Sequence, residues 1–168
     1  VLGLPAVVHV HDGLRGVREH RASLTSRDGA EERREVEEVL ENCRKYNPRA
    51  RVIKCASVIA VDRPELIKGK RALVVEDGPT VTHGEMSYGA GTLAARKFGG
   101  EEIVDPRPYA AGSLADTFRK YPRTGPVLPA MGYGDQQVKD LQATINKVPC
   151  EVVIIGTPID PNRIVQIE

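Results

Sequence analysis

The sequence predicts an α/β fold with a parallel, Rossmann-like sheet flanked by helices. Two observations support this prediction. After Lys70, four short apolar runs alternate with stretches of helical periodicity, and strands that alternate with helices indicate right-handed crossovers and a parallel sheet. Each run is also followed by a loop rich in Gly, Pro and Asp. In open α/β sheets, ligands bind outside the carboxyl ends of the strands.

The predicted strands are the runs RALVV, EEIV, PVLPAM and EVVII. The first helix between them covers residues 87–98 and stops at Gly99-Gly100, a suitable C-terminal cap. The second begins at Ser113, has Asp116 three residues later as a near capping box, and ends before Pro122. The third has Asp135 as its N-cap and an apolar face made of Val138, Leu141 and Ile145.

Ahead of Pro64 the pattern differs. Residues 31–46 read as a charged helix, because Val36, Val39, Leu40 and Cys43 form one apolar stripe. Residues 50–57 read as a strand, and residues 60–70 as a connector. Residues 1–30 show no clear period and are expected to be irregular. His9 and His11 alternate as on a strand and could hold a metal, but a solvated segment is favoured because no third ligand is near. The predicted division is therefore 1–30, 31–63 and 64–168.

Composition excludes several classes of protein. The net charge of +1 argues against nucleic-acid and membrane-surface binding, which usually require a basic excess. The three cysteines are widely spaced and read as reduced thiols rather than as a disulfide framework or a zinc site. No run reaches membrane-spanning length. We expect a cytoplasmic homo-oligomer, and, because the chain starts without Met, a fragment or a processed product.

The loop after the first strand, EDGPTVTHGEMSYGAG, concentrates the candidate catalytic residues Asp77 and His83. The glycines that follow could admit a phosphate to the start of a helix, where unpaired N–H groups and the helix dipole favour anions. The predicted phosphate-binding residues there are Gly84, Gly89 and Gly91. Simpler alternatives are that Asp77 starts a turn, that His83 is a hydrogen-bonded loop residue, and that the glycines only allow close packing.

The other strand ends supply further candidates. Two prolines hold Arg107 in an extended loop that suits bidentate phosphate or carboxylate recognition, although a surface arginine in a stiff turn is the alternative. Thr157 follows the last strand, and a possible second anion cradle lies before the third helix at Gly132, Tyr133 and Gly134. Because Mg²⁺ prefers carboxylate oxygens, a magnesium site is predicted at Asp77, Asp105 and Asp160.

Several of these motifs resemble one known family. The stretches VEDGPTVTHGEMSYGAG, IVDPRPYAAGS, YPRTGPVLPAMGYGDQQVKDLQATIN and IIGTPID closely resemble the C-terminal part of the cyclic 2,3-diphosphoglycerate synthetase family, whose relatives are often labelled predicted GTPases. The resemblance covers residues 31–168; Pro161 departs from it where leucine is expected. It implies an ATP-dependent enzyme that forms an intramolecular phosphoanhydride in 2,3-bisphosphoglycerate, with this part gripping the phosphorylated substrate.

The nucleotide site of that family lies elsewhere. It uses a P-loop, and no G-x-x-x-x-G-K-[ST] motif occurs in this chain. The resemblance therefore implies that ATP or GTP, with Mg²⁺, binds mainly to an upstream domain, of which residues 31–63 would be the tail. A ligand-sensing domain of a GTPase-like regulator and a dinucleotide-binding oxidoreductase domain are the alternatives. The latter is disfavoured because the first turn reads E-D-G-P rather than G-x-G-x-x-G.

Overall fold

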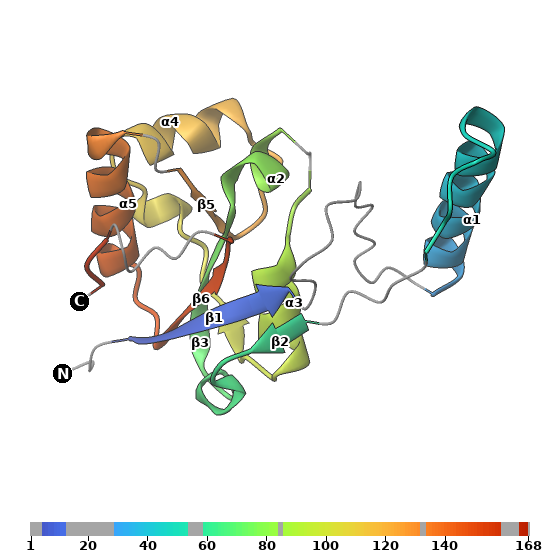
Figure 1. Cartoon of the computed structure of the whole chain (residues 1–168). Coiled ribbons are helices and arrows are strands. Elements are labelled where there is room, and N and C mark those ends of the chain that lie inside the picture. Colours follow the sequence, from blue (N-terminus) through green and yellow to red (C-terminus); the bar gives the residue numbers. More distant parts are fainter. Residues whose placement is uncertain are drawn as a thin grey trace. The chain divides into compact units, whose positions relative to one another are not determined.

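A mainly parallel sheet flanked by helices confirms the predicted α/β fold (Figure 1). This computed structural model describes residues 5–12, 29–53, 59–83, 86–131, 134–158 and 165–167. Six strands of the described part form one sheet: β1 Ala6–Asp12, β2 Ile59–Val61, β3 Arg71–Asp77, β4 Glu102–Ile103, β5 Leu128–Ala130 and β6 Val152–Gly156. Their order is β2-β1-β6-β3-β4, and β5 also pairs with β3. In this part of the chain, β1 and β2 pair antiparallel and the other pairs are parallel.

The helices follow the strands in the predicted rhythm. Their bounds are α1 Gly29–Tyr46, η1 Pro64–Leu66, α2 Gly78–Thr82, α3 Ala90–Lys97, η2 Arg107–Tyr109, α4 Ser113–Lys120 and α5 Asp135–Lys147. The predicted cap after α3 is present, because Gly99 adopts φ 75°, a conformation that L side chains rarely adopt. α5 stops at Lys147 because the next residue precedes a proline and takes an extended conformation.

Two of the predicted N-terminal caps are wrong. The N-cap of α4 is Gly112 rather than Ser113. Asp116 does not close a capping box, because it pairs instead with Arg119 one turn later. The N-cap of α5 is Gly134, and Asp135 is the first helical residue. In both cases a glycine directly before the expected polar residue takes the capping position.

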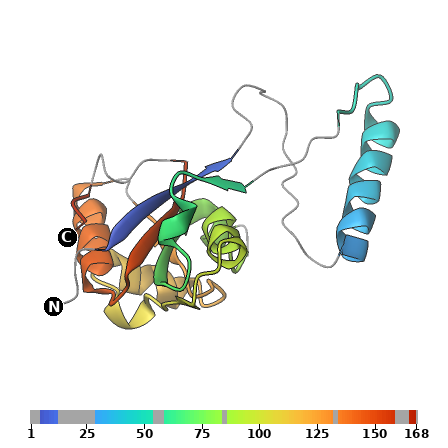
Figure 2. The ribbon, with the colours of Figure 1, turned by 90° about the horizontal axis from the view of Figure 1, so that it is seen from below.

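The strands β3 and β6 are buried on both faces, which explains their continuous runs of Val, Leu and Ile. Because side chains alternate along a strand, each run feeds two cores. One core joins Leu73 and Val75 to the apolar sides of α4 and α5. The other joins Ala72 and Val74 to the alanines of α3 and to Ile67. Figure 2 shows α3 and α5 on opposite sides of the strands.

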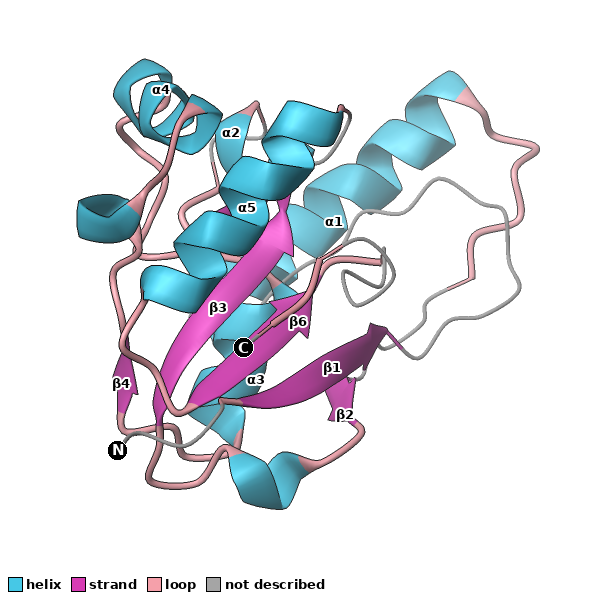
Figure 3. Ribbon diagram, turned by 90° about the vertical axis from the view of Figure 1, so that its left-hand side faces the viewer, coloured by secondary structure: helices cyan, strands magenta, loops and turns pink. Residues whose placement is uncertain are grey.

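Strand β3 is the centre of the sheet, and its two sides differ. β6 covers one side over residues 72–76. The other side is shared, because β4 pairs only with residues 71–72 and β5 pairs with residues 75–77. Figure 3 shows β3, β6 and β1 side by side, with β4 beside the start of β3.

The N-terminal part differs from the prediction. Residues 6–12, expected to be irregular, form β1, which pairs in parallel with β6 from Ala6 to His9. This strand extends an already hydrogen-bonded sheet, so its pairing does not depend on a strong local pattern. The chain splits into two compact units, residues 1–12 with 59–168 and residues 13–58. The boundary between them therefore falls before β2 rather than at Pro64.

The second unit contains α1, as the apolar stripe predicted. Leu40 is buried, whereas Val39 is 42% exposed. Residues 50–53, part of the predicted strand, do not form one, and residues 54–57 lie outside the described part. Among the described helices, none combines the length and the apolar character that crossing a bilayer requires.

Candidate functional site

Of the four strands predicted from the sequence, three end together at the carboxyl edge of the sheet, where β1 also ends because it runs parallel to β6. Asp77 at the end of β3 lies opposite Ala130 of β5, and Glu76 lies opposite Gly156 of β6. By contrast, β4 ends opposite Ala72, five positions before Asp77 along β3, or about 16 Å at the usual rise per residue. The loop after β4 therefore leaves the sheet early, because β5 takes the rest of that side of β3.

Glu76 is the dominant feature of this edge, and the sequence reading did not include it among the candidate residues. Its side chain is 1% exposed. Oε1 accepts hydrogen bonds from the backbone N–H of Gly89 (3.0 Å) and from the N–H and hydroxyl of Thr92 (2.8 and 2.9 Å). Oε2 accepts from the N–H of Gly91 (3.2 Å). The carboxylate therefore occupies the N-terminus of α3.

Burial raises the pKa of the Glu76 carboxyl above its ordinary value, and the hydrogen bonds from Thr92, Gly91 and Gly89 oppose part of that shift. The glycines around it provide room for the carboxylate. A Cβ added at Gly89 would lie 2.6 Å from Oε2, and one at Gly156 would lie 2.5 Å from Oε2 and 2.6 Å from the backbone nitrogen of Gly91. These contacts favour the close-packing alternative for Gly89 and Gly91. An internal carboxylate takes the place predicted for phosphate.

Asp77 caps the short helix α2. Its Oδ2 accepts hydrogen bonds from the backbone N–H and the hydroxyl of Thr80, at 3.3 and 2.8 Å. This is the ordinary role of an aspartate before a helical turn. Oδ1 accepts no hydrogen bond from the residues that the structure describes. One oxygen of Asp77 is therefore free to meet a ligand at the carboxyl edge.

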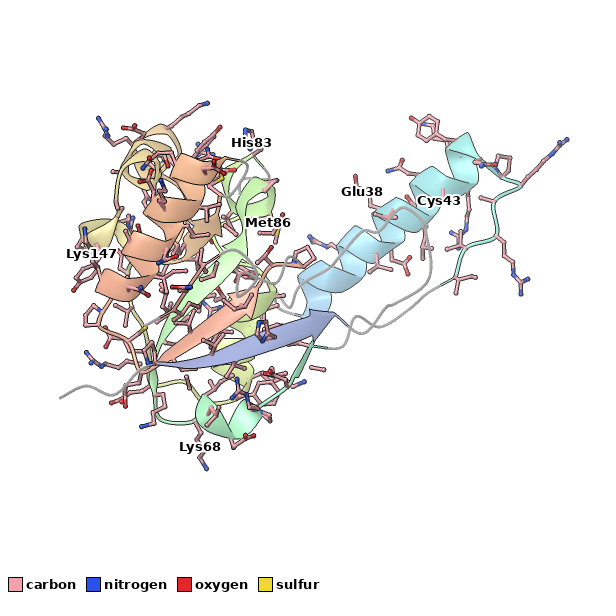
Figure 4. All side chains as sticks on the ribbon, turned by 60° about the vertical axis from the view of Figure 1, so that its left-hand side comes forward. Glu38, Cys43, Lys68, His83, Met86 and Lys147 are labelled. Atoms are coloured by element: carbon pink, nitrogen blue, oxygen red, sulfur yellow. The ribbon has the colours of Figure 1, made fainter. Side chains whose placement is uncertain are left out.

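His83 follows α2 as its C-cap and lies on the surface. Its Nδ1 lies 2.9 Å from the hydroxyl of Thr82, and its Nε2 lies 2.9 Å from the hydroxyl of Tyr121 at the end of α4. The rings of His83 and Tyr121 are 5.1 Å apart and tilted by 57°. Figure 4 shows His83 with Met86 at the end of the unit opposite Lys68. Tyr121, like Glu76, was not predicted.

Arg107 and Asp105 bind each other. The arginine Nε lies 2.9 Å from both carboxylate oxygens and its Nη2 lies 2.6 Å from Oδ2, while the Arg107 backbone N–H also donates to Oδ1. The guanidinium holds the pKa of the Asp105 carboxyl below its ordinary value, and the carboxylate raises the pKa of Arg107 in turn. The guanidinium N–H groups at Nε and Nη2, which could otherwise bind a ligand, are thus directed at Asp105.

A second carboxylate caps another helix from outside it. Asp140 on α5 accepts hydrogen bonds from the backbone N–H and hydroxyl of Ser113, at 2.8 and 2.7 Å, and from Gln136. Gly112 precedes this contact with φ 46°, and an added Cβ there would lie 2.4 Å from Asp140. The hydrogen bonds from Ser113 and Gln136 lower the pKa of the Asp140 carboxyl. Asp140, rather than Asp116, therefore stabilises the start of α4.

The remaining predicted residues are only partly described. Gly134 lies exposed at the start of α5, and Thr157 is buried directly after β6. Gly84, Gly132, Tyr133 and Asp160 fall outside the described residues. Within the described ranges, no three His, Cys, Asp or Glu side chains lie close enough together to hold a metal ion. The described members of the predicted magnesium set fit poorly, since Asp77 caps α2 and Asp105 binds Arg107; the full set stays a prediction.

The sequence is similar to part of a curated protein. Over 131 residues it is 60% identical to arginine synthetase ArcE from Thermococcus kodakarensis, and this match covers 78% of the chain. The chain spans 29% of the length of that protein. No protein-family model matches the chain, and no solved structure does. The similarity is thus to part of a protein that is named as a synthetase.

This finding corrects the function implied by the family resemblance. The similar protein is named for arginine synthesis, so cyclic 2,3-diphosphoglycerate synthesis from 2,3-bisphosphoglycerate is wrong as the prediction for this chain. The resemblance was right only in pointing to a synthetase. Glycine-rich loops at strand ends were interpreted as phosphate sites, whereas Gly89 and Gly91 surround a buried glutamate of the chain itself.

Proposed function

We propose that this chain is part of a ligase that forms arginine. The observation that carries the proposal is the 60% identity over 131 residues to a protein named arginine synthetase. Identity at this level over most of the chain supports a shared role for the aligned part. The chain spans 29% of that protein. The proposed arginine-forming activity is therefore that of a whole enzyme, of which this chain is one part.

Within that enzyme, the carboxyl edge of the sheet is the part of this chain best placed to meet the substrate. Ligands of open α/β sheets bind outside this edge. The described polar groups there include Oδ1 of Asp77, which accepts no hydrogen bond from the described residues, and the His83–Tyr121 pair. Arginine and its amino-acid precursors carry N–H donors, and a carboxylate oxygen and a phenol oxygen can both accept hydrogen bonds from them. This chemistry suits a nitrogen-rich substrate better than a multiply charged phosphate.

A synthetase of this kind needs an energy source, for which we propose ATP with Mg²⁺. This chain contains no P-loop motif, so the proposal assigns the nucleotide to another part of the enzyme. The described residues offer Asp77 as a possible ligand to Mg²⁺ and no complete set. We therefore assign no step to the metal here. The proposed part played by this chain is to bind and orient the nitrogen-bearing substrate.

The test uses the complete protein that carries this chain. It is supplied with ATP, Mg²⁺, ¹⁵N-ammonium and amino acids that have the carbon chain of arginine but lack one guanidino nitrogen. We expect ¹⁵N-labelled arginine, detected by mass spectrometry, and a loss of product in an Asp77→Asn variant that keeps its fold. A folded protein that binds ATP yet labels no arginine from any such precursor contradicts the proposal.

A separate measurement tests the role of the chain itself. Thermal unfolding of the isolated chain is followed with L-arginine and with L-lysine, because only a ligand that binds the folded state raises the melting temperature. We expect arginine to stabilise the chain and lysine, which lacks the guanidino group, to do so less. Equal effects of the two amino acids would mean that general cation binding, not recognition of arginine, occurs here.

A further inference from the structure

A chain of four hydrogen-bonded groups leads from Tyr121 at the end of α4 to the buried first residue of α2. It begins at the Tyr121 hydroxyl, 2.9 Å from His83 Nε2, and continues from His83 Nδ1 to the Thr82 hydroxyl, also 2.9 Å. The Thr82 hydroxyl in turn donates to the carbonyl of Gly78 at 2.7 Å. Residues at the ends of two helices thus hold one imidazole from both of its nitrogens.

The hydrogen bond from Thr82 to the Gly78 carbonyl fixes the direction of the other two. A backbone carbonyl can only accept, so the single hydroxyl proton of Thr82 points at Gly78. The Thr82 oxygen must then accept from His83, which places a proton on Nδ1. In the neutral imidazole, Nε2 is therefore the acceptor, and the Tyr121 hydroxyl donates to it. His83 is held as a base whose lone pair faces a phenol.

This arrangement has the layout of an activated pair rather than of a simple surface contact. A group with a transferable proton, a base within hydrogen-bond reach and a third group that orients the base form the usual signature of such sites. The loop after α4 is also tied to α2, because the Thr124 hydroxyl donates to the Val81 carbonyl at 3.2 Å. The Lys120 ammonium lies 5.2 Å from the centre of the Tyr121 ring and places a cation beside the phenol.

We propose that Tyr121 and His83 form a proton-accepting pair for the nitrogen that the enzyme joins to carbon. This inference rests on the proposed arginine-forming function. The attacking nitrogen gives one proton to the Tyr121 oxygen as the phenolic proton moves to His83 Nε2. The proton on Nδ1 stays there, hydrogen-bonded to the Thr82 hydroxyl. The nitrogen lone pair forms the new C–N bond, and the C–O bond to a leaving phosphate, supplied by the nucleoside triphosphate, breaks.

The first test is a measurement of the tautomer that needs no substrate. Long-range ¹H–¹⁵N NMR spectra of the chain with ¹⁵N-labelled histidine identify which ring nitrogen carries the proton, and His83→Gln assigns the signal. We expect the Nδ1–H form of His83, and a shift towards Nε2–H in a Thr82→Val variant that removes the acceptor. A wild-type His83 in the Nε2–H form overturns the proposal, since Nε2 then cannot accept from Tyr121.

The second test is the kinetics of the complete protein. Tyr121→Phe and His83→Gln should each lower kcat by roughly 10² to 10⁴-fold, the usual range for a lost proton-transfer group, with a much smaller change in KM. The double variant should lose no more than the worse single one, because the pair acts as a unit. Tyr88→Phe is the matched control, since Tyr88 is also half-buried and its ring lies 5.5 Å from the Arg96 guanidinium rather than beside a base.

The outcomes separate the two proposals. An active enzyme whose kcat survives Tyr121→Phe overturns the proton-accepting pair and leaves arginine formation standing. A wild-type protein that makes no arginine overturns the proposed function and, with it, the nitrogen substrate of the pair. A Tyr121→Phe loss that appears in the melting temperature and equally in every kinetic constant means that the hydrogen bonds only join α2 to α4, which also overturns the proposal.

Discussion

Replacing Glu76 by glutamine tests the most buried polar contact of the sheet edge. The amide oxygen can occupy the position of Oε1 and keep the three hydrogen bonds from Gly89 and Thr92. The amide nitrogen then faces the N–H of Gly91, and two donors cannot satisfy each other. A buried donor left without an acceptor costs about 1–3 kcal/mol. We expect that loss in the free energy of unfolding wherever Glu76 of the wild type is protonated.

The loss should become smaller as the pH rises. Burial raises the pKa of Glu76 above its ordinary value of 4.5, so the folded state holds its proton more tightly than the unfolded state. The resulting stability is fully present below pH 4.5 and is lost as the pH rises through the raised pKa. Glutamine does not titrate. The advantage of wild type over Glu76→Gln should therefore be largest in mild acid and smaller at neutral pH.

Urea unfolding of both proteins from about pH 4, below the ordinary value of 4.5, to about pH 8 measures this difference. Glu102→Gln, which removes the same charge from an exposed position on β4, is the control and should show no such trend. An advantage that grows with rising pH would refute the reasoning. It would mean that the hydrogen bonds and the dipole of α3 stabilise the carboxylate more than burial destabilises it.

Three further predictions concern neighbouring contacts. Gly156→Ala should destabilise the chain by about 1–3 kcal/mol, the usual cost of overpacking, because the added Cβ would lie 2.6 Å from the backbone nitrogen of Gly91. The control is Gly134→Ala, whose Cβ meets no atom within 4 Å and which should cost less in the same urea experiment. Asp140→Asn should be less stable than wild type above pH 3.8. The difference in unfolding free energy should disappear as the pH falls through the lowered pKa of Asp140, which urea unfolding at a series of acid pH values would measure. If Arg107 grips an anionic group of a ligand, Asp105→Asn should free its fork and tighten that binding, and unchanged affinity in calorimetry would exclude the role.

The fold was predictable because its strongest signals are local and periodic. The runs that became β3 and β6 are apolar throughout, as strands buried on both faces must be, and α3 stops at the predicted Gly99. The alternation of His9 and His11 hinted at a strand, but β1 was not predicted as part of the sheet because its pairing with β6 depends on a partner about 145 residues away in sequence. Local periodicity carries no information about such a partner.

The candidate site was predictable only in part. His83 was identified from its place after a strand, and the structure does bring it to the carboxyl edge beside a polar partner. That partner, Tyr121, comes from the end of α4; it is the first residue of the stretch YPRTGPVLPAMGYGDQQVKDLQATIN, but nothing in that stretch indicates contact with His83. The distance in sequence between them is the reason, because side-chain pairs of this kind are specified by the packing of helices and not by spacing along the chain.

The misplaced phosphate site has a more general cause. Glycines at the start of a helix allow any carboxylate or phosphate to approach the free N–H groups, and the sequence does not say whether the anion is a ligand or a side chain. In this chain the described helices α2, α3 and α4 each hold a carboxylate of the protein itself, from Asp77, Glu76 and Asp140. The distinguishing sign for α3 is the acid that interrupts an apolar strand. Glu76 ends a run of four buried residues, a position where an ionisable side chain is costly unless donors surround it. An acid so placed requires a partner inside the fold, and the glycine-rich start of the next helix is the nearest source of unpaired donors.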